Sequence, residues 1–451
     1  MKTILIIGAG KSATVLIDYL LANAVKKERK VIIADHHLDH LSEKINQNPL
    51  CEGIRLELND ENFREQLISK ADVVISMLPA NLHPVVAKDC LRLGKHFFSA
   101  SYESSEMREM AEEVKAKGLF FLNECGLDPG IDHMSAMKII DDEKEKGNEI
   151  TLFKSYCGGL VTPESEGDNP WKYKFSWNPR NVVLAGQGVS RFLMNGKFKF
   201  IPYHMLFRRT DLIKFKAVGN FDGYANRDSL GYRQVYGLEN IPTIIRGTLR
   251  REGFCKSWDV LVQLGLTDNS FQMDLPRDFT HRMFINAFLP FHATRSIEEK
   301  IVSLLPWVDQ EILDKISWLG LLSDEMLPRF KGSPAKILQD ILENKWAMEP
   351  DDKDMVVMQH HFEVECQKGT KEITSSLVIK GEDREHTAMA KTVGLPLFLA
   401  VDLFLEGEIK LKGLHLPTLK EIYEPILEGL EKHGIVFDEE VNWKKSNEKA
   451  N

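Results

Sequence analysis

A short apolar run near the N-terminus, TILII (residues 3–7), ends directly in the glycine-rich stretch GAGKSA (residues 8–13). A stretch with apolar residues at helical spacing follows, and a second apolar run, VIIA (31–34), then ends in Asp35. This order of strand, G-x-G-x-x-A turn, helix, strand and acid predicts a dinucleotide-binding βαβ unit. The glycines let the backbone approach a pyrophosphate, to which the start of the helix offers free N–H groups. A glycine-rich turn in another kind of α/β protein is the alternative.

The alternation of strand-like and helix-like segments continues to about residue 125. The expected strands are residues 54–58, 72–78, 96–101 and 118–122, and the expected helices are residues 60–69, 84–93 and a segment that ends at 112. Such alternation predicts a doubly wound parallel sheet with right-handed crossovers. Ligands of these sheets bind at the carboxyl ends of the strands.

The acid at the end of the second apolar run bears on the choice of cofactor. An acid at this place hydrogen-bonds the hydroxyls of the adenosine ribose and repels a 2′-phosphate, so Asp35 favours NAD over NADP. The nearby His36, His37 and Lys11 would soften that preference. In the simpler alternative, Asp35 is a solvated loop residue.

The stretch NECGLDPGIDHM (residues 123–134) follows the last of these expected strands. Asp128 before Pro129 has the pattern of a helix start, with the carboxylate as N-cap and the proline in the first turn, and the helix would run to about residue 144. A metal site is not expected, because Asp132 and His133 are adjacent and diverge on a helix. A carboxylate at the mouth of a dinucleotide-binding fold could also receive a substrate ammonium, so Asp128 could do both.

Charge and composition narrow the classes of partner. The chain of 451 residues has a formal net charge of −9 and a pI near 5.9, which argues against nucleic acid or an anionic membrane as partner. Its longest apolar stretch, residues 393–405, contains Pro396 and Asp402, so no membrane span of ~20 residues is expected. The N-terminus lacks the pattern of a secretory signal. Six cysteines without a C-x-x-C pair fit a reducing cytosol, without zinc or disulfides.

Aromatic and basic residues alternate in NPWKYKFSWNP (residues 169–179), which predicts a half-buried strand or extended segment. An aromatic–basic ladder could bind single-stranded nucleic acid. The acidic chain and the single ladder argue against that, so core packing or a wall near a nicotinamide is the preferred interpretation.

The remaining segments predict further elements. Residues 296–348 have a helical pattern, with a capping-box signal at Ser296–Glu299 and a helix start at Ser333-Pro334. Residues 355–366 and 372–380 flank a turn and predict a hairpin. Residues 386–407 predict a buried helix interrupted at 394–396, and residues 417–433 a C-terminal helix.

Several long motifs together resemble the saccharopine dehydrogenase family of the glutamate-forming type, also called saccharopine reductases. They are, in chain order, NECGLDPGIDHMSAMK, KSYCGGLVTPES, NPWKYKFSWNPRNVVLA, YANRDS, IIRGTLRREGF and TAMAKTVGLP. Members of this family catalyse the reversible NAD(P)-dependent oxidation of saccharopine to 2-aminoadipate 6-semialdehyde and glutamate, in lysine metabolism. The resemblance runs in order along most of the chain.

The resemblance implies an α/β protein with three parts that forms a homodimer, and the cysteine pattern predicts a cytoplasmic location. A Rossmann domain with a doubly wound parallel sheet would span residues 1–128 and about 410–451, so that the C-terminal helix and residues 441–443 pack back on it. A second α/β domain for substrate binding and dimerisation would span 129–290 and 351–409. A small helical domain would span 291–350.

The resemblance also implies site residues. Those expected at the cofactor are Gly8, Gly10, Lys11, Ser12, Ala13, Thr14, Asp35, His36, Leu58, Asn59, Leu78 and Pro79. Those expected at saccharopine are Ser101, Tyr102, Asp128, Arg227, Thr248, Leu249 and Arg250, and Cys157 would line the same cleft. Fungal members carry basic or hydroxyl residues where this chain has Asp35 and His36, and an aromatic residue where it has Lys11, so the phosphate preference is open.

The chemistry of saccharopine agrees with some of these residues. Its three carboxylates call for arginines, whose planar fork binds a carboxylate through two parallel bonds. Residues 224–251 contain five arginines, of which two or three are expected to reach the substrate, Arg227 and Arg250 among them. The alternative is that most of the five are surface arginines. Asp128, Tyr102 and Cys157 are candidates for a general acid or base, or for orienting water. For each of the three, a structural role is the alternative, and water could move the protons instead.

Two other functions remain open at this stage. The first is a sister oxidoreductase acting on a carboxylated polyamine of the carboxynorspermidine type. That substrate is cationic and would favour acids in place of Arg227 and Arg250. The second is a non-catalytic protein that senses a dinucleotide.

Overall fold

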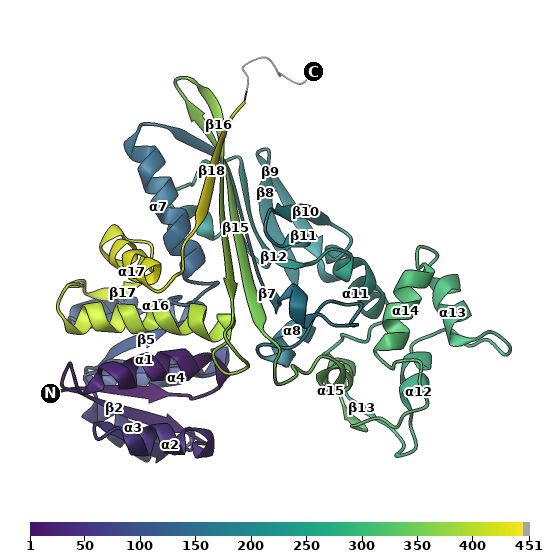
Figure 1. Ribbon diagram of the computed structural model, residues 1–451, viewed down its shortest axis with the longest axis horizontal. Helices are drawn as coiled ribbons and strands as arrows, with labels where there is room; N and C mark the ends of the chain where they lie inside the picture. The colour runs from purple at the N-terminus through teal and green to yellow at the C-terminus, as the bar shows by residue number, and fades with distance from the viewer. Residues whose placement is uncertain (445–451) are drawn as a thin grey trace. The chain divides into compact units, whose positions relative to one another are not determined.

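The computed structural model describes residues 1–444 (Figure 1). The chain forms two compact units, each assembled from separate stretches of sequence. The first consists of Met1–Glu149 and Glu385–Asp438, and the second of Ile150–Arg384 and the chain after Asp438.

A parallel sheet of seven strands forms the centre of the first unit, in the order β17-β6-β5-β4-β1-β2-β3. The strands are β1 (Lys2–Ile7), β2 (Arg29–Asp35), β3 (Cys51–Arg55), β4 (Val73–Ser76), β5 (His96–Ser99), β6 (Phe120–Leu122) and β17 (Gly413–His415). The chain leaves β1 first toward β2 and then crosses to β4 on its other side. This reversal creates the switch point at which such sheets bind ligands. The expected doubly wound sheet is confirmed.

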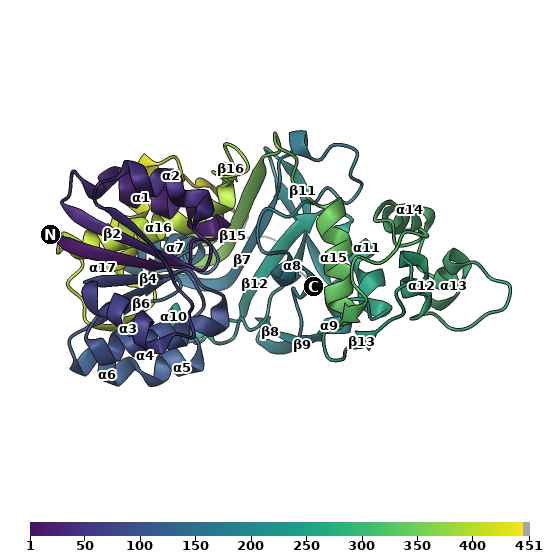
Figure 2. The ribbon, with the colours of Figure 1, turned by 90° about the horizontal axis from the view of Figure 1, so that it is seen from below.

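Helices cover both faces of this sheet. They are α1 (Thr14–Ala24), α2 (Ser42–Gln47), α3 (Glu61–Lys70), α4 (His83–Leu93), α5 (Ser105–Glu109), α6 (Ala111–Ala116), α7 (Ile131–Glu145), α16 (Ala388–Leu405) and α17 (Lys420–Lys432). Figure 2 shows α3 and α4 on one side of the sheet and α1 and α16 on the other. On the first face, Leu5, Val74 and Phe97 join one apolar cluster with Leu67 and Val86 of the helices.

Helix α16 is continuous, so the expected interruption at residues 394–396 is wrong. Pro396 lies inside the helix, although a proline removes one helical hydrogen bond. Tertiary packing holds this segment against α1: a Cβ atom on Gly394 would stand 2.7 Å from the backbone nitrogen of Leu16. The ring of Phe404 also stacks on Phe120 of β6, with centroids 5.2 Å apart.

Length and composition would let α16 cross a membrane, contrary to the expectation from sequence. However, 61% of the helix is buried inside the structure. Its Asp402 also forms ion pairs with Arg29 and Lys27 of the same unit. The helix therefore has the features of a core element of this unit.

The two units divide at other residues than the expected domains. Helix α7 belongs to the first unit because it packs on α17, where the Tyr423 hydroxyl donates to Asp141 at 2.7 Å. Helix α16 belongs to it as well. In contrast, β18 (Asp438–Trp443) extends the sheet of the second unit beside β16. The expectation that residues 441–443 pack on the Rossmann domain is therefore wrong.

A mixed sheet of nine strands forms the second unit. Its main order is β10-β11-β12-β7-β15-β16-β18, and β8 pairs with β12 and β9. The strands are β7 (Glu149–Val161), β8 (Val189–Met194), β9 (Lys197–Pro202), β10 (Thr210–Phe215), β11 (Gly219–Ala225), β12 (Thr243–Arg251), β15 (Asp354–Cys366) and β16 (Gly369–Lys380). The expected hairpin is formed by β15 and β16, which pair in antiparallel register.

The helices of the second unit include the segment that was expected to be a separate helical domain. They are α8 (Pro179–Val183), α9 (Tyr203–Leu206), α10 (Tyr232–Val235), α11 (Phe254–Gln263), α12 (His281–Asn286), α13 (Ile297–Leu304), α14 (Gln310–Trp318) and α15 (Pro334–Lys345), with the short strands β13 (Met273–Asp274) and β14 (Lys331–Gly332). The capping box at Ser296 and the N-cap at Ser333 are confirmed. The apolar residues of α13–α15 share one core with α11, so the helical segment is part of this unit.

The aromatic ladder of residues 169–177 packs into that core without forming a strand. Trp171, Tyr173 and Phe175 are buried and surround Trp346, and the Phe175 nitrogen donates to the Trp346 carbonyl at 2.7 Å. Core packing, the preferred interpretation of the ladder, is confirmed.

Candidate active site

The glycine-rich loop leaves β1 at its carboxyl end and leads into a short 3₁₀ turn, Lys11–Ala13, and then α1. Gly8 has φ +101°, and a Cβ atom there would stand 2.8 Å from the backbone carbonyl of Met77, so only glycine fits. Gly10 is exposed, and nothing lies within 4 Å of its Cβ position. The loop thus offers open backbone at the start of a helix, which suits the diphosphate of a dinucleotide.

Asp35, at the end of β2, is fixed against this loop. Its Oδ2 accepts a hydrogen bond of 2.6 Å from the Ala9 nitrogen, and its Oδ1 accepts one of 2.9 Å from the His37 nitrogen. The alternative of a freely solvated loop acid is therefore wrong. The exposed His36 ring lies 2.6 Å from the Glu57 carboxylate, between Nδ1 and Oε1.

The other residues expected at the cofactor lie on this edge of the sheet or after its strands. Lys11, Asn59 and Pro79 are exposed, Ser12, Thr14, Leu58 and Leu78 are partly exposed, and Ala13 is buried. Pro79 precedes the 3₁₀ turn Ala80–Leu82, and the Leu58 carbonyl accepts a hydrogen bond from the Arg64 guanidinium. The structure therefore brings the loop, Asp35 and Leu78 to the ends of the adjacent strands β1, β2 and β4.

Tyr102 and Asp128 meet at the neighbouring end of the same sheet. The Tyr102 hydroxyl donates a hydrogen bond of 3.0 Å to Asp128 Oδ1, and both side chains are partly exposed. Ser101, beside Tyr102, is held by a bond of 3.0 Å from its nitrogen to Ser99 Oγ. The structure thus joins three residues that sequence reasoning placed at the substrate.

The expectation that Asp128 caps the following helix is wrong. Helix α7 begins at Ile131, and Gly130, with φ +148°, occupies the N-cap position. Asp132, in the first turn, provides the side-chain hydrogen bond at the start of the helix instead. Its Oδ1 accepts a hydrogen bond of 2.6 Å from the Gly130 nitrogen. The Asp128 carboxylate is therefore not used as a cap and faces Tyr102.

In the second unit, Cys157 of β7 and Thr248 of β12 stand opposite each other on adjacent parallel strands. Cys157 is 6% exposed and Thr248 is partly exposed, whereas Leu249 is fully buried. Arg227 follows β11, is exposed and has φ +44°, a left-handed conformation that is uncommon for a residue other than glycine.

Two family models match the chain, and both describe the same family. The model of the saccharopine dehydrogenase NADP binding domain matches residues 4–122, and that of the saccharopine dehydrogenase C-terminal domain matches residues 126–435. The chain belongs to the saccharopine dehydrogenase family. The part of the chain that the NADP binding domain model matches includes the glycine-rich loop and Asp35.

Individual relatives extend the saccharopine dehydrogenase match over nearly the whole chain. The saccharopine dehydrogenase [NADP(+), L-glutamate-forming] of Schizosaccharomyces pombe is 34% identical over 98% of this chain and 99% of its own length. The mitochondrial alpha-aminoadipic semialdehyde synthase of Mus musculus is 35% identical over 97% of this chain. The chain spans about half the length of that relative, 47%.

A solved structure has the same fold. It is the apo, histidine-tagged saccharopine dehydrogenase (L-Glu forming) of Saccharomyces cerevisiae, which has 33% sequence identity and a TM-score of 0.88. The match covers 98% of this chain and all of that one. The similarity to the saccharopine dehydrogenases therefore extends from motifs to the whole architecture.

The arginines of this family member differ in burial. Arg250 is 2% exposed; its guanidinium lies 5.1 Å from the ring centre of Tyr173, and among the described residues no acid pairs with it. Arg246 and Arg251 are buried as well, Arg246 over the Tyr232 ring and Arg251 against the Glu166 carboxylate. The alternative that most of the five arginines lie on the surface is therefore wrong, because three of them are buried.

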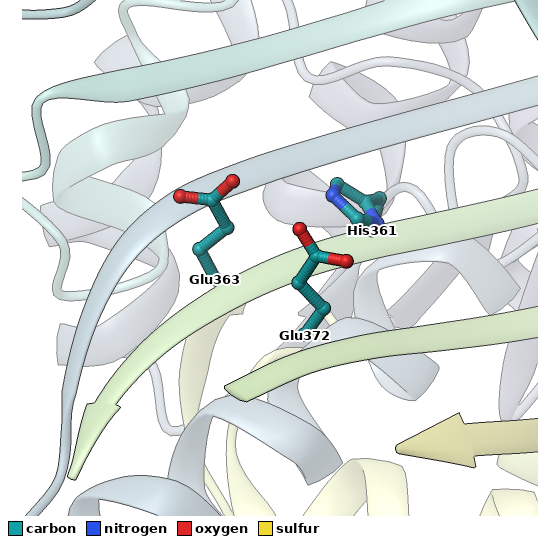
Figure 3. Close-up of side chains that lie close together, drawn as sticks. All are labelled: His361, Glu363 and Glu372. Atoms are coloured by element: carbon teal, nitrogen blue, oxygen red, sulfur yellow. The ribbon is translucent and has the colours of Figure 1, made fainter. Parts of the chain in front are cut away.

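One group of side chains has the spacing of metal ligands and is paired with a lysine. His361 and Glu363 of β15 and Glu372 of β16 project from the same face of the hairpin (Figure 3). The Lys444 ammonium lies 2.8 Å from the Glu363 carboxylate and 2.9 Å from that of Glu372. The Lys444 ammonium therefore pairs with both carboxylates at the place that a metal ion would take.

His83 was not singled out from the sequence, although it lies next to the candidate site. It begins α4, after the 3₁₀ turn that follows the expected cofactor residues Leu78 and Pro79, and it is 6% exposed. Its Nδ1 lies 2.8 Å from Ser76 Oγ and 3.4 Å from Ser99 Oγ, so it ties together the ends of β4 and β5. Burial lowers the pKa of His83 to about 4. Its position directly before Pro84 was the only signal in the sequence.

Proposed function

We propose that this protein catalyses the reversible, nicotinamide-dinucleotide-dependent oxidation of saccharopine to 2-aminoadipate 6-semialdehyde and glutamate. The match to glutamate-forming saccharopine dehydrogenases over nearly the whole of both chains carries the proposal. The glycine loop and the Tyr102–Asp128 pair at the carboxyl edge of one sheet supply the binding surface and the proton-transfer groups that the reaction needs.

The protein's own part in this reaction is positioning and proton transfer. When bound, the nicotinamide cofactor accepts the hydride from the carbon next to the secondary amine of saccharopine. The amine must first lose its proton, and the Asp128 carboxylate is the acceptor at this edge of the sheet. The Tyr102 hydroxyl donates to Asp128 and so holds that carboxylate in one orientation.

Hydrolysis completes the oxidative direction. Water adds to the carbon of the carbon–nitrogen double bond, the carbon–nitrogen bond then breaks, and the nitrogen leaves as the amino group of glutamate. This step moves protons from water to nitrogen, and the Asp128–Tyr102 pair is placed to relay them. Cys157 and Thr248 offer further polar groups in the second unit.

Arginines suit the three carboxylates of saccharopine. Arg227 is exposed and can bind a carboxylate directly. Arg250 carries a buried positive charge without an acid partner among the described residues, which favours an anion over a cation as ligand. The positive charge of Arg250 would repel the cationic groups of a polyamine substrate. Direct contact of the buried Arg250 side chain with substrate stays a prediction.

For the cofactor we propose a preference for NAD. The fixed carboxylate of Asp35 lies at the end of β2, where it would repel a 2′-phosphate and still have lone pairs for ribose hydroxyls. The names of the family model and of the fungal relatives specify NADP and favour the opposite choice. If Asp35 sets the preference for NAD, then Asp35→Ser should raise kcat/KM for NADP relative to kcat/KM for NAD at least tenfold.

The test is the absorbance of reduced nicotinamide with purified protein and saccharopine, run with NAD and with NADP. The expected result is saccharopine-dependent reduction, faster with NAD. If saccharopine reduces NADP but not NAD, the proposed role of Asp35 is refuted and the proposed reaction stands. If the protein binds the dinucleotide but saccharopine causes no reduction of either cofactor, the proposed reaction is refuted. The same assay with a carboxylated polyamine then tests the alternative substrate.

A homodimer and a cytoplasmic location stay predictions. Light scattering on the purified protein would give the mass in solution, and a value near 51.5 kDa would contradict the dimer because that is the mass of one chain. Imaging of a tagged chain in its own cell would test the location.

A further inference from the structure

A buried acid, Glu124, follows β6 in a backbone conformation that few residues other than glycine adopt. Its φ is +56°, and the residue is 2% exposed. The left-handed region is unfavourable for an ordinary residue, because Cβ comes too close to the backbone. Such strain persists only where the surroundings impose it, and it gathers at functional sites.

The contacts of Glu124 show what imposes this conformation. Its Oε1 accepts a hydrogen bond of 2.9 Å from the Glu103 nitrogen, and its Oε2 lies 2.8 Å from His133 Nε2 on α7. Its own backbone nitrogen donates to the Ser101 carbonyl at 3.0 Å. One residue therefore links the loop after β5, the end of β6 and the first turn of α7.

Tyr102 lies between the two loop residues that Glu124 holds. We propose that Glu124, braced by His133, is a positioning residue that fixes Tyr102 against Asp128 for catalysis. This inference rests on the proposed function, because it assigns a role within that reaction. The buried carboxylate is well suited to the task, since hydrogen bonds to an ionised group are shorter and stronger than those between neutral groups. A displacement of about 1 Å at such a site can cost on the order of a hundredfold in rate.

The test compares Glu124→Gln with Glu143→Gln. Glu143 is a matched control: it is also a buried acid, 3% exposed, but it lies toward the other end of α7, where it bonds to Lys146 and Asn148. Glu124→Gln should lower kcat/KM for saccharopine at least tenfold and leave the Kd of the dinucleotide within about twofold. Glu143→Gln should leave both constants within about twofold. Equal kcat/KM values for the two variants would overturn the proposal.

A double variant separates positioning from general weakening of the fold. If Glu124 acts through Tyr102, then Tyr102→Phe combined with Glu124→Gln should be no more than about twofold slower than Tyr102→Phe alone. Multiplying losses would show that the two residues act independently, and would overturn the proposal.

Substitutions of His133 keep the inference testable if Glu124→Gln does not fold. His133→Gln retains a donor toward Glu124, whereas His133→Leu removes it. The glutamine variant should keep at least tenfold more activity per folded molecule than the leucine variant, and equal activity would contradict the role. An inactive wild-type protein would refute the proposed function, whereas an active wild type with unaffected variants would refute only this inference.

Discussion

Acidification should destabilise the nucleotide-binding unit through His83. This residue is enclosed at the start of α4, and burial lowers its pKa from 6.5 to about 4. A cation at the amino end of a helix is also unfavourable, because the helix dipole is positive there. The folded protein therefore holds His83 neutral at pH values at which the unfolded chain protonates it.

The sign and size of the effect follow from these two pKa values. The contribution of neutral His83 to the free energy of unfolding is fully present above about pH 6.5. It falls as the pH drops from 6.5 to about 4 and changes little below pH 4. The full difference between the two pKa values corresponds to about 3 kcal/mol, and about 2 kcal/mol of it is lost by pH 5. Other groups titrate in the same range, so a reference variant is needed.

His83→Asn is that reference, since an amide oxygen can still accept from the Ser76 hydroxyl but does not titrate. Hydrogen exchange of β4 and β5 would report the opening free energy of the wild type and the variant at about pH 7.5 and pH 5. The advantage of the wild type over the variant should shrink by about 2 kcal/mol on acidification. An advantage that is the same at both pH values would refute the reasoning.

Three further substitutions have defined outcomes. Asp128→Ala should cut turnover at least tenfold while the dinucleotide Kd is retained, and an unchanged rate in the absorbance assay would rule out its catalytic role. Gly8→Ala should weaken dinucleotide binding at least tenfold in a fluorescence titration, because its Cβ would press on the Met77 carbonyl; equal binding would show that the loop can shift. Asp402→Ala should lower the free energy of unfolding by about 2 kcal/mol, since the buried Arg29 then keeps only Glu406 as an acid partner; a loss below about 1 kcal/mol in urea unfolding would contradict the importance of the pair.

The parts of the fold that sequence could predict are those with a strong local pattern. Strand β1, the glycine loop and β2 follow from apolar runs and from glycines that the backbone requires, and the parallel order follows from the alternation of elements. The position of the site at the carboxyl edge follows from the sheet type alone. Local pattern also gave the capping box at Ser296 and the hairpin of β15 and β16.

The sequence-based predictions were wrong where a contact between residues farther apart determines the local structure. Asp128-Pro129 has the local pattern of a helix start, but Gly130 and Asp132 take that function and free Asp128 for Tyr102. Pro396 looks like an interruption, but close packing on α1 keeps the helix whole. Glu124 carries no signal in the sequence at all, because its role depends on a loop more than twenty residues earlier and on a strained backbone angle.

The assembly of the first unit from both ends of the chain has a consequence for biosynthesis. Strand β17 and helices α16 and α17 can join β6 and α1 only after the ribosome has made residues 150–384, most of the second unit. At ordinary rates of translation that interval lasts roughly 10–50 s. Throughout it, the face of the sheet around Phe98 and Phe120 lacks the cover that Phe404 later provides. The nascent nucleotide-binding unit therefore exposes an aggregation-prone apolar surface for much of the chain's synthesis. Shielding of this surface by a chaperone at that stage would govern the yield of folded protein.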